Sequence, residues 1–467
     1  MSTVLTDRLQ SAKEDAVRNV DADAAVFAEV NRTIWQLAEP SLLEHKSAEQ
    51  LASLLEQNGF TVRRGVADMP TAFVAEWGTG EPLVGILAEY DALPSLSQQA
   101  QPDRGPIVPG GYGHGCGHSV FGTACTFAGI AVKKAMAKAK IVGRIRVYGC
   151  PAEELLVGKV YMARDGLFND LDAAITWHPS DKTEVTLGSG KAMVSVHYTF
   201  AGVASHASAS PHRGRSALDA VELMNVGVNY MREHVKEDAR LHYVITDGGV
   251  QPNVVPPSAS VWYYIRADRH DDVETYLAWV DQIANGAALM TQTTLVERKL
   301  DTDCHELVPN RVIADALDRN LRSVGPPRFS EEEKAFAEQI RATIPDAPDG
   351  PALLEEVLPP PATESRRGGG STDVGDVSWL VPTEQFRVTT QANGCPGHSW
   401  QITACTGTSI GEKGGMVAAK TLACTALDLL ADADLRERAR KEFKQRRGDI
   451  PYRLLIPADQ KPPIPSV

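Results

Sequence analysis

The chain has 467 residues, of which 43% are hydrophobic, so it is long and apolar enough to form at least one large core. Its 60 acidic and 47 basic residues give a net charge of −13, which argues against a nucleic-acid groove or a polybasic membrane patch. The first residues lack the apolar core of a signal peptide, and the longest apolar runs are strand-sized, so we expect no membrane segment. Seven widely spaced cysteines predict reduced thiols and a cytoplasmic protein.

Residues 1–190 alternate helical and strand patterns. The apolar runs between the predicted helices are continuous, which is typical of strands buried on both faces of a mostly parallel sheet. We therefore expect an α/β domain to begin in this region. The predicted elements are a helix over 21–59, strands over 72–77, 83–88, 145–148 and 173–177, and a helix over 121–137.

Residues 191–302 follow a different order and are predicted to form a separate domain inserted into the first. The pattern strand-helix-strand-strand-helix-strand is that of a ferredoxin-like unit. We expect strands over 193–200, 241–246, 261–267 and 293–299, and helices over 216–234 and 273–290.

Residues 303–467 are predicted to complete the first domain, which is therefore discontinuous. A Pro/Gly-rich insertion at about 325–370 interrupts this part, and the end of the chain is charged and then rich in proline, which is typical of a surface arm. The expected elements are a helix near 330–342, a strand over 385–390, a helix over 413–430 and the C-terminal arm over 431–467.

Residues of the types that bind metals or carry protons follow four of the predicted strands directly. In open parallel sheets, binding sites form where the carboxyl ends of the strands meet. One such placement is expected by chance, but four together indicate a site. The residues are Glu89 and Asp91, Glu153 and Glu154, His178, and His398.

A glycine-rich segment over 113–118 adds a thiol and an imidazole just before a predicted helix. Glycines let the backbone turn tightly, so that Cys116 and His118 can face one cation. A thiolate is a strong zinc ligand and can bridge two metals. The alternative is a glycine-rich turn with a half-buried histidine.

The Glu153-Glu154 pair follows Pro151, and such a pair is often the solvated start of a helix. Adjacent side chains diverge, however, so one carboxylate can hold a metal while the other faces a water that the metal activates. Metal-assisted hydrolysis with a general base requires that arrangement.

These motifs resemble those of the dinuclear metallopeptidases that include carboxypeptidase G, the aminoacylases and hippurate hydrolase, and within that family the amidohydrolase branch. The resemblance covers most of the chain in the same order. The matching stretches are ILAEYDALP (86–94), GHGCGHSVFGTA (113–124), VYGCPAEE (147–154), RDGLFNDLDAAITWHP (164–179), SHASASPHRGRSALDAVELMNVGV (205–228), GGVQPNVVP (248–256), GGSTDVGDVSW (369–379) and PGHSW (396–400).

The resemblance implies two divalent metal ions, zinc or manganese, bridged by Cys116. It implies that His118 and His178 complete one site, and that Glu154 and His398 complete the other. Glu153 would be the general base. The inserted domain would be a lid that also dimerises, and His206 of the lid would reach the partner's active site to stabilise the oxyanion. The alternative for His206 is a hydrogen bond to its own loop.

Further residues are assigned less directly. Asn253 matches a lid asparagine near the substrate in the family, and Arg266 could meet a substrate carboxylate or be a surface strand residue. His305, at the exit from the lid, is a candidate substrate contact. His114 and Asp91 are candidates to support the metal ligands, with turn stabilisation and strand-end capping as the alternatives.

The leading function is therefore metal-dependent hydrolysis of the amide of an N-acyl or N-aroyl amino acid, with p-aminobenzoyl-glutamate as the first compound to test. A cysteine hydrolase using Cys116 and His118 leaves the strand-end residues unexplained. A third hypothesis is that the chain is a non-catalytic or weakly active partner subunit of a heteromeric amidohydrolase. As an alternative substrate, the enzyme would hydrolyse another small amide or a dipeptide. We expect a homodimer through the lid, or a heteromer with a related subunit.

Overall fold

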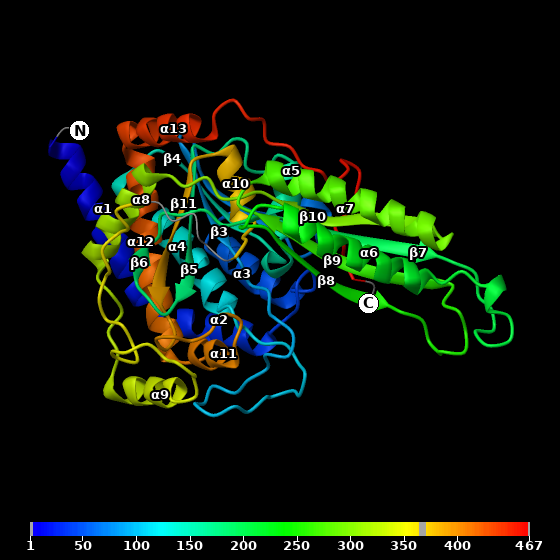
Figure 1. Cartoon of the computed structure of the whole chain (residues 1–467). Coiled ribbons are helices and arrows are strands. Elements are labelled where there is room, and N and C mark those ends of the chain that lie inside the picture. The colour runs from blue at the N-terminus through cyan, green and yellow to red at the C-terminus, as the bar shows by residue number, and fades with distance from the viewer. Residues whose placement is uncertain (1–2, 364–369, 466–467) are drawn as a thin grey trace.

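The computed structural model describes residues 3–363 and 370–465, and its larger part is built on a seven-stranded sheet (Figure 1). The strand order is β1-β2-β4-β3-β5-β11-β6, and the neighbours β4, β3, β5 and β11 are parallel. The α/β class and the mostly parallel sheet are therefore confirmed. The strands are β1 (Thr61–Arg64), β2 (Phe73–Thr79), β3 (Leu83–Ala88), β4 (Gly143–Gly149), β5 (Ala173–Ser180), β6 (Glu184–Val185) and β11 (Thr383–Thr389).

Both faces of the sheet are covered, as the continuous apolar runs predicted. Along β3, Val84 and Ile86 belong to one buried cluster while Leu83 and Leu87 belong to another, because successive side chains of a strand point to opposite faces. The helices of the first cluster are α1 (Thr3–Ala22), α2 (Ala24–Leu37), α3 (His45–Gln57), α4 (His118–Ala139), α8 (Arg311–Val324), α12 (Ser409–Ala431) and α13 (Ala433–Arg447), and those of the second are α5 (Gly158–Arg164) and α10 (Val374–Leu380).

Helices α4 and α12 are long and apolar enough, by length and composition, to cross a membrane. The most apolar 18-residue windows of these helices are, however, 83% and 78% buried inside the fold. Both helices pack against each other and against the central sheet, so their composition is that of core helices of a large domain.

The single helix expected over 21–59 is wrong. Helix α2 ends at Leu37, where Ala38 adopts a left-handed conformation, and α3 begins only at His45. Pro40 lies in the break, and a proline inside a helix removes a backbone donor and clashes with the preceding turn. Helix α1 and the short strand β1 were not expected.

The inserted domain has the predicted order of elements. Its four strands form one antiparallel sheet in the order β10-β7-β9-β8, with two helices packed on it and a separate core. This domain projects to the right in Figure 1, away from α1. Its elements are β7 (Ala192–Ala201), α6 (Ala217–Met231), β8 (Arg240–Asp247), β9 (Ser258–Ala267), α7 (His270–Thr291) and β10 (Thr294–Cys304), and we call it the lid.

The Pro/Gly-rich insertion is more ordered than a linker. It contains α9 (Glu331–Arg341), which begins with a complete capping box between Ser330 and Glu333. A small apolar cluster packs this segment against α11 (Trp400–Thr406) and the start of α12. Residues 364–369 of the expected insertion lie outside the described residues.

The C-terminal segment is a helix followed by an arm that spans both domains. Helix α13 buries three apolar side chains, and the arm then returns to the junction with the lid. The Tyr452 hydroxyl donates to Asp376 Oδ1 at 3.0 Å in the larger domain, and Arg453 pairs with Glu274 in the lid. The remaining elements are four single 3₁₀ turns, η1 (Val66–Asp68), η2 (Glu153–Leu155), η3 (Pro211–Arg213) and η4 (Arg232–His234).

Candidate metal centre

The carboxyl ends of four parallel strands meet at one edge of the large sheet, and the predicted site residues follow those ends. Glu89 and Asp91 follow β3, and the turn after β4 leads to Glu153 and Glu154 in η2. His178 lies inside the end of β5, and His398 lies in the loop after β11. The parallel register β4-β3-β5-β11 therefore brings together residues that are up to 309 positions apart in the chain, since the first is Glu89 and the last His398.

Cys116 and His118 reach the same edge from the start of α4. Gly117 between them has φ = 82°, and a Cβ at this position would lie 2.8 Å from the Pro179 side chain. A residue without a side chain is therefore required here, both for the left-handed backbone and for the close approach to β5. The glycine-rich segment was thus a real signal for a turn that presents two donor side chains.

Five side chains form what we call the ligand cluster: Cys116, His118, Glu154, His178 and His398. Their donor atoms fall into two groups, each with all atoms within 4.8 Å of one another. One group is Cys116, His118 and His178, and the other is Cys116, Glu154 and His398. The Cys116 Sγ atom is common to both groups, and it lies 3.4 Å from His178 Nε2.

The two inner histidines are held in the orientation that a metal ligand needs. His118 donates its Nδ1–H to Asp91 Oδ1 at 2.8 Å, and His178 donates its Nδ1–H to the Pro179 carbonyl at 2.7 Å. In each ring the Nε2 atom therefore faces the cluster. Burial, followed by the charge of His118, lowers the pKa of His178 to about 3, which keeps this ring neutral.

Asp91 supports the cluster in more than one direction. Its second carboxylate oxygen accepts hydrogen bonds from the Ser41 hydroxyl at 2.7 Å and from the backbone N–H of Glu154 at 3.0 Å. Asp91 thus fixes His118 and the backbone that carries Glu154. His114 is also buried, but its Nε2 donates to the carbonyl of Ile34 at 3.0 Å rather than contacting a ligand.

Glu153 and Glu154 diverge from the turn η2, as adjacent side chains should. Glu154 Oε2 lies 3.3 Å from Nε2 of His398, whose side chain is 57% exposed and stands at the rim. Glu153 points to the inner side, with Oε2 4.0 Å from His118 Nε2. Burial, with the charges of Glu89 and Asp373, raises the pKa of Glu153 well above its usual value.

The donor set fits divalent cations. Among the described residues, His118 Nε2, Glu154 Oε1 and Glu89 Oε2 are buried and have no hydrogen-bond partner, although such atoms are almost always paired. Burial raises the pKa of Glu154 to about 7, so a positive neighbour is needed to stabilise the ionised carboxylate at neutral pH. A thiol, imidazoles and carboxylates directed at one space are the ligands that zinc and related metals take.

The structure does not bring His206 and Asn253 to the ligand cluster of the same chain. Both are exposed on lid loops, where the Ala207 N–H donates to the Asn253 carbonyl at 3.0 Å. His206 Nδ1 accepts from the N–H groups of Ser208 and Ala209 at 3.3 and 3.2 Å, which is the local bonding considered as the alternative. Any role in catalysis therefore requires a second chain or a lid movement.

Arg266 and His305 lie at the junction of the lid with the larger domain, in different surroundings. Arg266 Nη1 donates to Ser371 Oγ at 3.0 Å, and its Nε is buried without a hydrogen-bond partner in the described part of the chain. His305 is only 2% exposed, stacks on the His270 ring at 3.8 Å and bonds Asp376. His305 is thus enclosed in a separate network, away from the ligand cluster.

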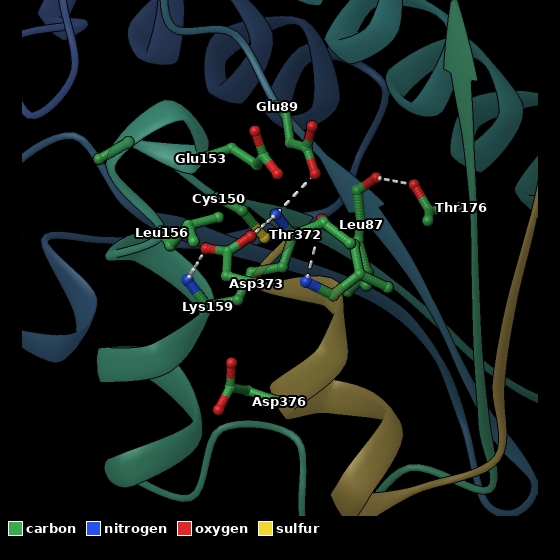
Figure 2. A network of polar contacts seen from close by, with 12 residues as sticks. Leu87, Glu89, Cys150, Glu153, Leu156, Lys159, Thr176, Thr372, Asp373 and Asp376 are labelled. Atoms are coloured by element: carbon green, nitrogen blue, oxygen red, sulfur yellow. Dashed lines mark hydrogen bonds and ion pairs between the residues drawn. The ribbon is translucent and has the colours of Figure 1, made fainter. Parts of the chain in front are cut away.

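Three buried charged residues near the site were missed. Two of them are Lys159 and Asp373, and Figure 2 shows Lys159 between Asp373 and Glu89, with Glu153 beside Glu89. The third is Glu44, whose Oε1 accepts the N–H of Ala152 at 2.8 Å and so holds the turn before Glu153. Asp373 lies in a stretch that matched the family, but no local pattern distinguishes a buried lysine from a surface one.

The comparisons with known proteins cover nearly the whole chain. Residues 189–290 match a family model described as a peptidase dimerisation domain. Over 95% of its length, the chain is 43% identical to one of the subunits of p-aminobenzoyl-glutamate hydrolase of Escherichia coli (strain K12), of which it covers 97%. It is also 29% identical to the Xaa-Arg dipeptidase of Mus musculus, over 93% of each chain.

Solved structures have the same fold at low sequence identity. A putative aminohydrolase from methicillin-resistant Staphylococcus aureus has a TM-score of 0.62 and 18% identity, covering 90% of this chain and 100% of that one. An aminobenzoyl-glutamate utilization protein from Klebsiella pneumoniae has a TM-score of 0.62 and 19% identity, covering 88% of this chain and 97% of that one. These likenesses support the two-domain arrangement of sheet and lid.

Proposed function

The chain belongs to the M20 family of peptidases and amidohydrolases, enzymes that hydrolyse carbon–nitrogen bonds, and on that premise we propose that it cleaves the amide bond of an N-acyl or N-aroyl amino acid. The first candidate substrate is p-aminobenzoyl-glutamate, because the relative with 43% identity over 95% of the chain is named for that reaction. The observation that carries the proposal is the pair of three-donor groups that share Cys116. The seven free cysteines support a cytoplasmic enzyme.

The proposed cofactor is a pair of divalent cations, zinc or manganese. Cys116, His118 and His178 would hold one, and Cys116, Glu154 and His398 the other. When bound, such cations polarise the amide carbonyl and activate a water molecule near neutral pH. Asp91 keeps His118 turned towards the site through its 2.8 Å hydrogen bond.

Glu153 is proposed as the general base. Its side chain is 10% exposed and lies on the inner side of the cluster, where it can accept a proton from the attacking water and return it to the leaving nitrogen. A raised pKa suits both steps, because the group must accept and release one proton in turn.

Arg266 is proposed to bind the carboxylate of the amino-acid half of the substrate. Its guanidinium is held by Ser371 and lies over the Tyr264 ring at 5.5 Å, and its buried Nε has no partner in the described part of the chain. A planar guanidinium with a free donor is well matched to a carboxylate. His206 and Asn253 are proposed to complete the site from the partner's lid, which explains their exposure within one chain.

A metal-dependent enzyme should lose activity to a chelator and regain it on addition of zinc or manganese. We expect hydrolysis of p-aminobenzoyl-glutamate by the purified chain to fall to background after dialysis against a chelator and to return when the cation is restored. The measurement is amine release from a panel of acyl- and aroyl-amino acids, with an Xaa-Arg dipeptide as the comparison substrate.

Two outcomes would contradict this proposal. Activity that survives complete metal removal would favour the cysteine hydrolase that uses Cys116. A metal-loaded chain that hydrolyses nothing alone, but does so after addition of a related second subunit, would favour the partner-subunit hypothesis. The relative from Escherichia coli is named as one subunit of its hydrolase, which makes the second outcome worth testing directly.

Subunit complementation tests whether His206 acts in a partner's site. His206→Ala and Glu153→Gln homodimers should each be inactive, whereas co-expression of the two chains should restore about a quarter of wild-type activity. Random pairing makes half of the dimers mixed, and each mixed dimer has one intact site. Activity is measured on the whole population of co-expressed dimers, and purification through a different tag on each chain, which selects the mixed dimers, should raise it to about half. An active His206→Ala homodimer would remove His206 from the mechanism.

A further inference from the structure

Lys159 is a fully buried lysine that the proposed reaction does not use. It is the second residue of α5, and its side chain is 0% exposed. Its position depends on Gly158, because a Cβ there would lie 1.9 Å from the Pro151 carbonyl oxygen in the turn before Glu153. The start of α5 is therefore packed directly against the segment that carries the general base.

Two carboxylates enclose the Lys159 ammonium group. Its Nζ lies 2.6 Å from Glu89 Oε1 and 2.6 Å from Asp373 Oδ1, as Figure 2 shows. The other oxygen of Asp373 accepts the backbone N–H of Lys159 at 2.8 Å. We call these three residues the lysine network. Glu89 and Asp373 are 1% and 0% exposed, so the network is closed to solvent.

The two carboxylates lead to opposite halves of the proposed site. The free oxygen of Glu89 lies 3.4 Å from Nε2 of His118, on the metal side. Asp373 is two residues from Ser371, which accepts the hydrogen bond of Arg266 from the lid at 3.0 Å. One ammonium group therefore connects a side chain facing the ligand cluster with the loop that holds the proposed carboxylate-binding arginine.

Stability alone is a weak reason for this network. The free energy needed to remove both charges of an ion pair from water is about as large as the free energy gained from their attraction. A protein with apolar residues of the same volume in place of the pair is therefore often as stable. The network is moreover not neutral, because it contains two carboxylates and one ammonium group, and Glu153 adds a third buried carboxylate nearby. Its position beside the ligand cluster points to a role in the site.

We propose that Lys159 is a positioning residue that holds the metal-facing Glu89 and the Ser371–Arg266 contact in fixed relation to each other. The inference rests on the proposed function, since it assigns Lys159 to the same site. Lys159 acts on Glu89 directly, and it acts on Arg266 through Asp373 and the loop that ends in Ser371. Its loss should therefore disturb metal retention and substrate binding together.

The test uses Lys159→Met and the double variant Lys159→Met/Asp373→Asn. The single change leaves two buried carboxylates without a cation, so it can prevent folding. The double change restores the net charge of the network, and the side-chain oxygen of the new asparagine can still accept the backbone N–H at position 159, so the protein should fold. Lys13→Met/Asp428→Asn is the matched control, because it removes another largely buried Lys–Asp pair, with Nζ and Oδ1 2.5 Å apart, on α1 and α12.

Two measurements are made on the folded double variant. We expect metal loss to a chelator, followed without substrate, to be at least about tenfold faster than in the wild type, and KM for p-aminobenzoyl-glutamate to rise at least about tenfold, as expected for a misplaced binding arginine. The Lys13→Met/Asp428→Asn control should change the melting temperature and neither of these values. Wild-type metal retention or a wild-type KM in the double variant would overturn the proposal.

Failure of the proposed function gives a different pattern. If the wild-type chain binds two metals but hydrolyses no member of the panel, the proposed function fails, and metal retention alone then decides the role of Lys159. Faster metal loss in the double variant still supports it, and unchanged metal loss overturns it.

Discussion

Replacing Glu153 by Gln is expected to lower kcat by about 10²–10⁴-fold while the protein keeps both metal ions, since a general base contributes about that much to catalysis. Glutamine has nearly the same shape but cannot accept a proton. Glu153 belongs to neither of the two donor groups that share Cys116, although its donor atom lies within 4.8 Å of those of Glu89 and His118; because glutamine keeps a side-chain oxygen there, the ligands of both groups should stay in place. The measurements are kcat at saturating substrate and metal content per chain by elemental analysis.

Glu154→Gln is the matched comparison, because it makes the same chemical change one residue further along. Glu154 lies 3.3 Å from His398 and is a member of a donor group, so this variant should lose metal as well as activity. Glu331→Gln, at a site 91% exposed, should change neither. A fully active Glu153→Gln enzyme, or one that has lost its metal, would contradict the assignment of Glu153 as the base.

The sequence predicted the fold well wherever the pattern was local and strong. Apolar runs predicted five of the seven strands in the large sheet, namely β2, β3, β4, β5 and β11, and the order of elements predicted the lid. The errors are at short or interrupted elements. Strand β1 has four residues and no buried side chain, and the helix pattern continues on both sides of Pro40, so apolar periodicity alone could not place the break.

The site could be predicted because its residues occupy one topological position. Cys116, His118, Glu154, His178 and His398 all lie at the strand ends or at the start of a helix beside them, and parallel pairing then forces them together. The structure also places Asp91, a predicted supporting residue, in contact with His118, one of the proposed ligands. The roles of these residues remain proposals that the variants above test.

What the sequence could not predict depends on long-range packing. Lys159 is followed by the buried residues Val160 to Ala163, but the carboxylates that pair with its ammonium group, Glu89 and Asp373, are 70 and 214 residues away in the chain. His305 stands next to the lid boundary in sequence, but stacking on His270 and bonding to Asp376 enclose it elsewhere. His206 and Asn253 lie on the lid surface, where one chain alone cannot show what they contact.

Replacing Cys116 by Ala is expected to remove both metal ions and to lower activity by more than about 10³-fold, because each donor group then keeps only two protein ligands. The loss of a shared ligand should be cooperative, so the protein should not stop at one metal per chain. Elemental analysis after dialysis and hydrolysis of p-aminobenzoyl-glutamate measure the two effects.

Cys424→Ala is the control, because this cysteine is 4% exposed on α12 and belongs to neither donor group. It should keep two metals and full activity. The Cys116 variant also separates the two hydrolase hypotheses. A nucleophilic cysteine would leave a dead enzyme that still binds its metals, whereas a bridging ligand leaves a metal-free protein. Burial raises the pKa of the Cys116 thiol well above its ordinary value, so without cations beside it this thiol would be a poor nucleophile, which favours the proposed ligand role over the nucleophilic one.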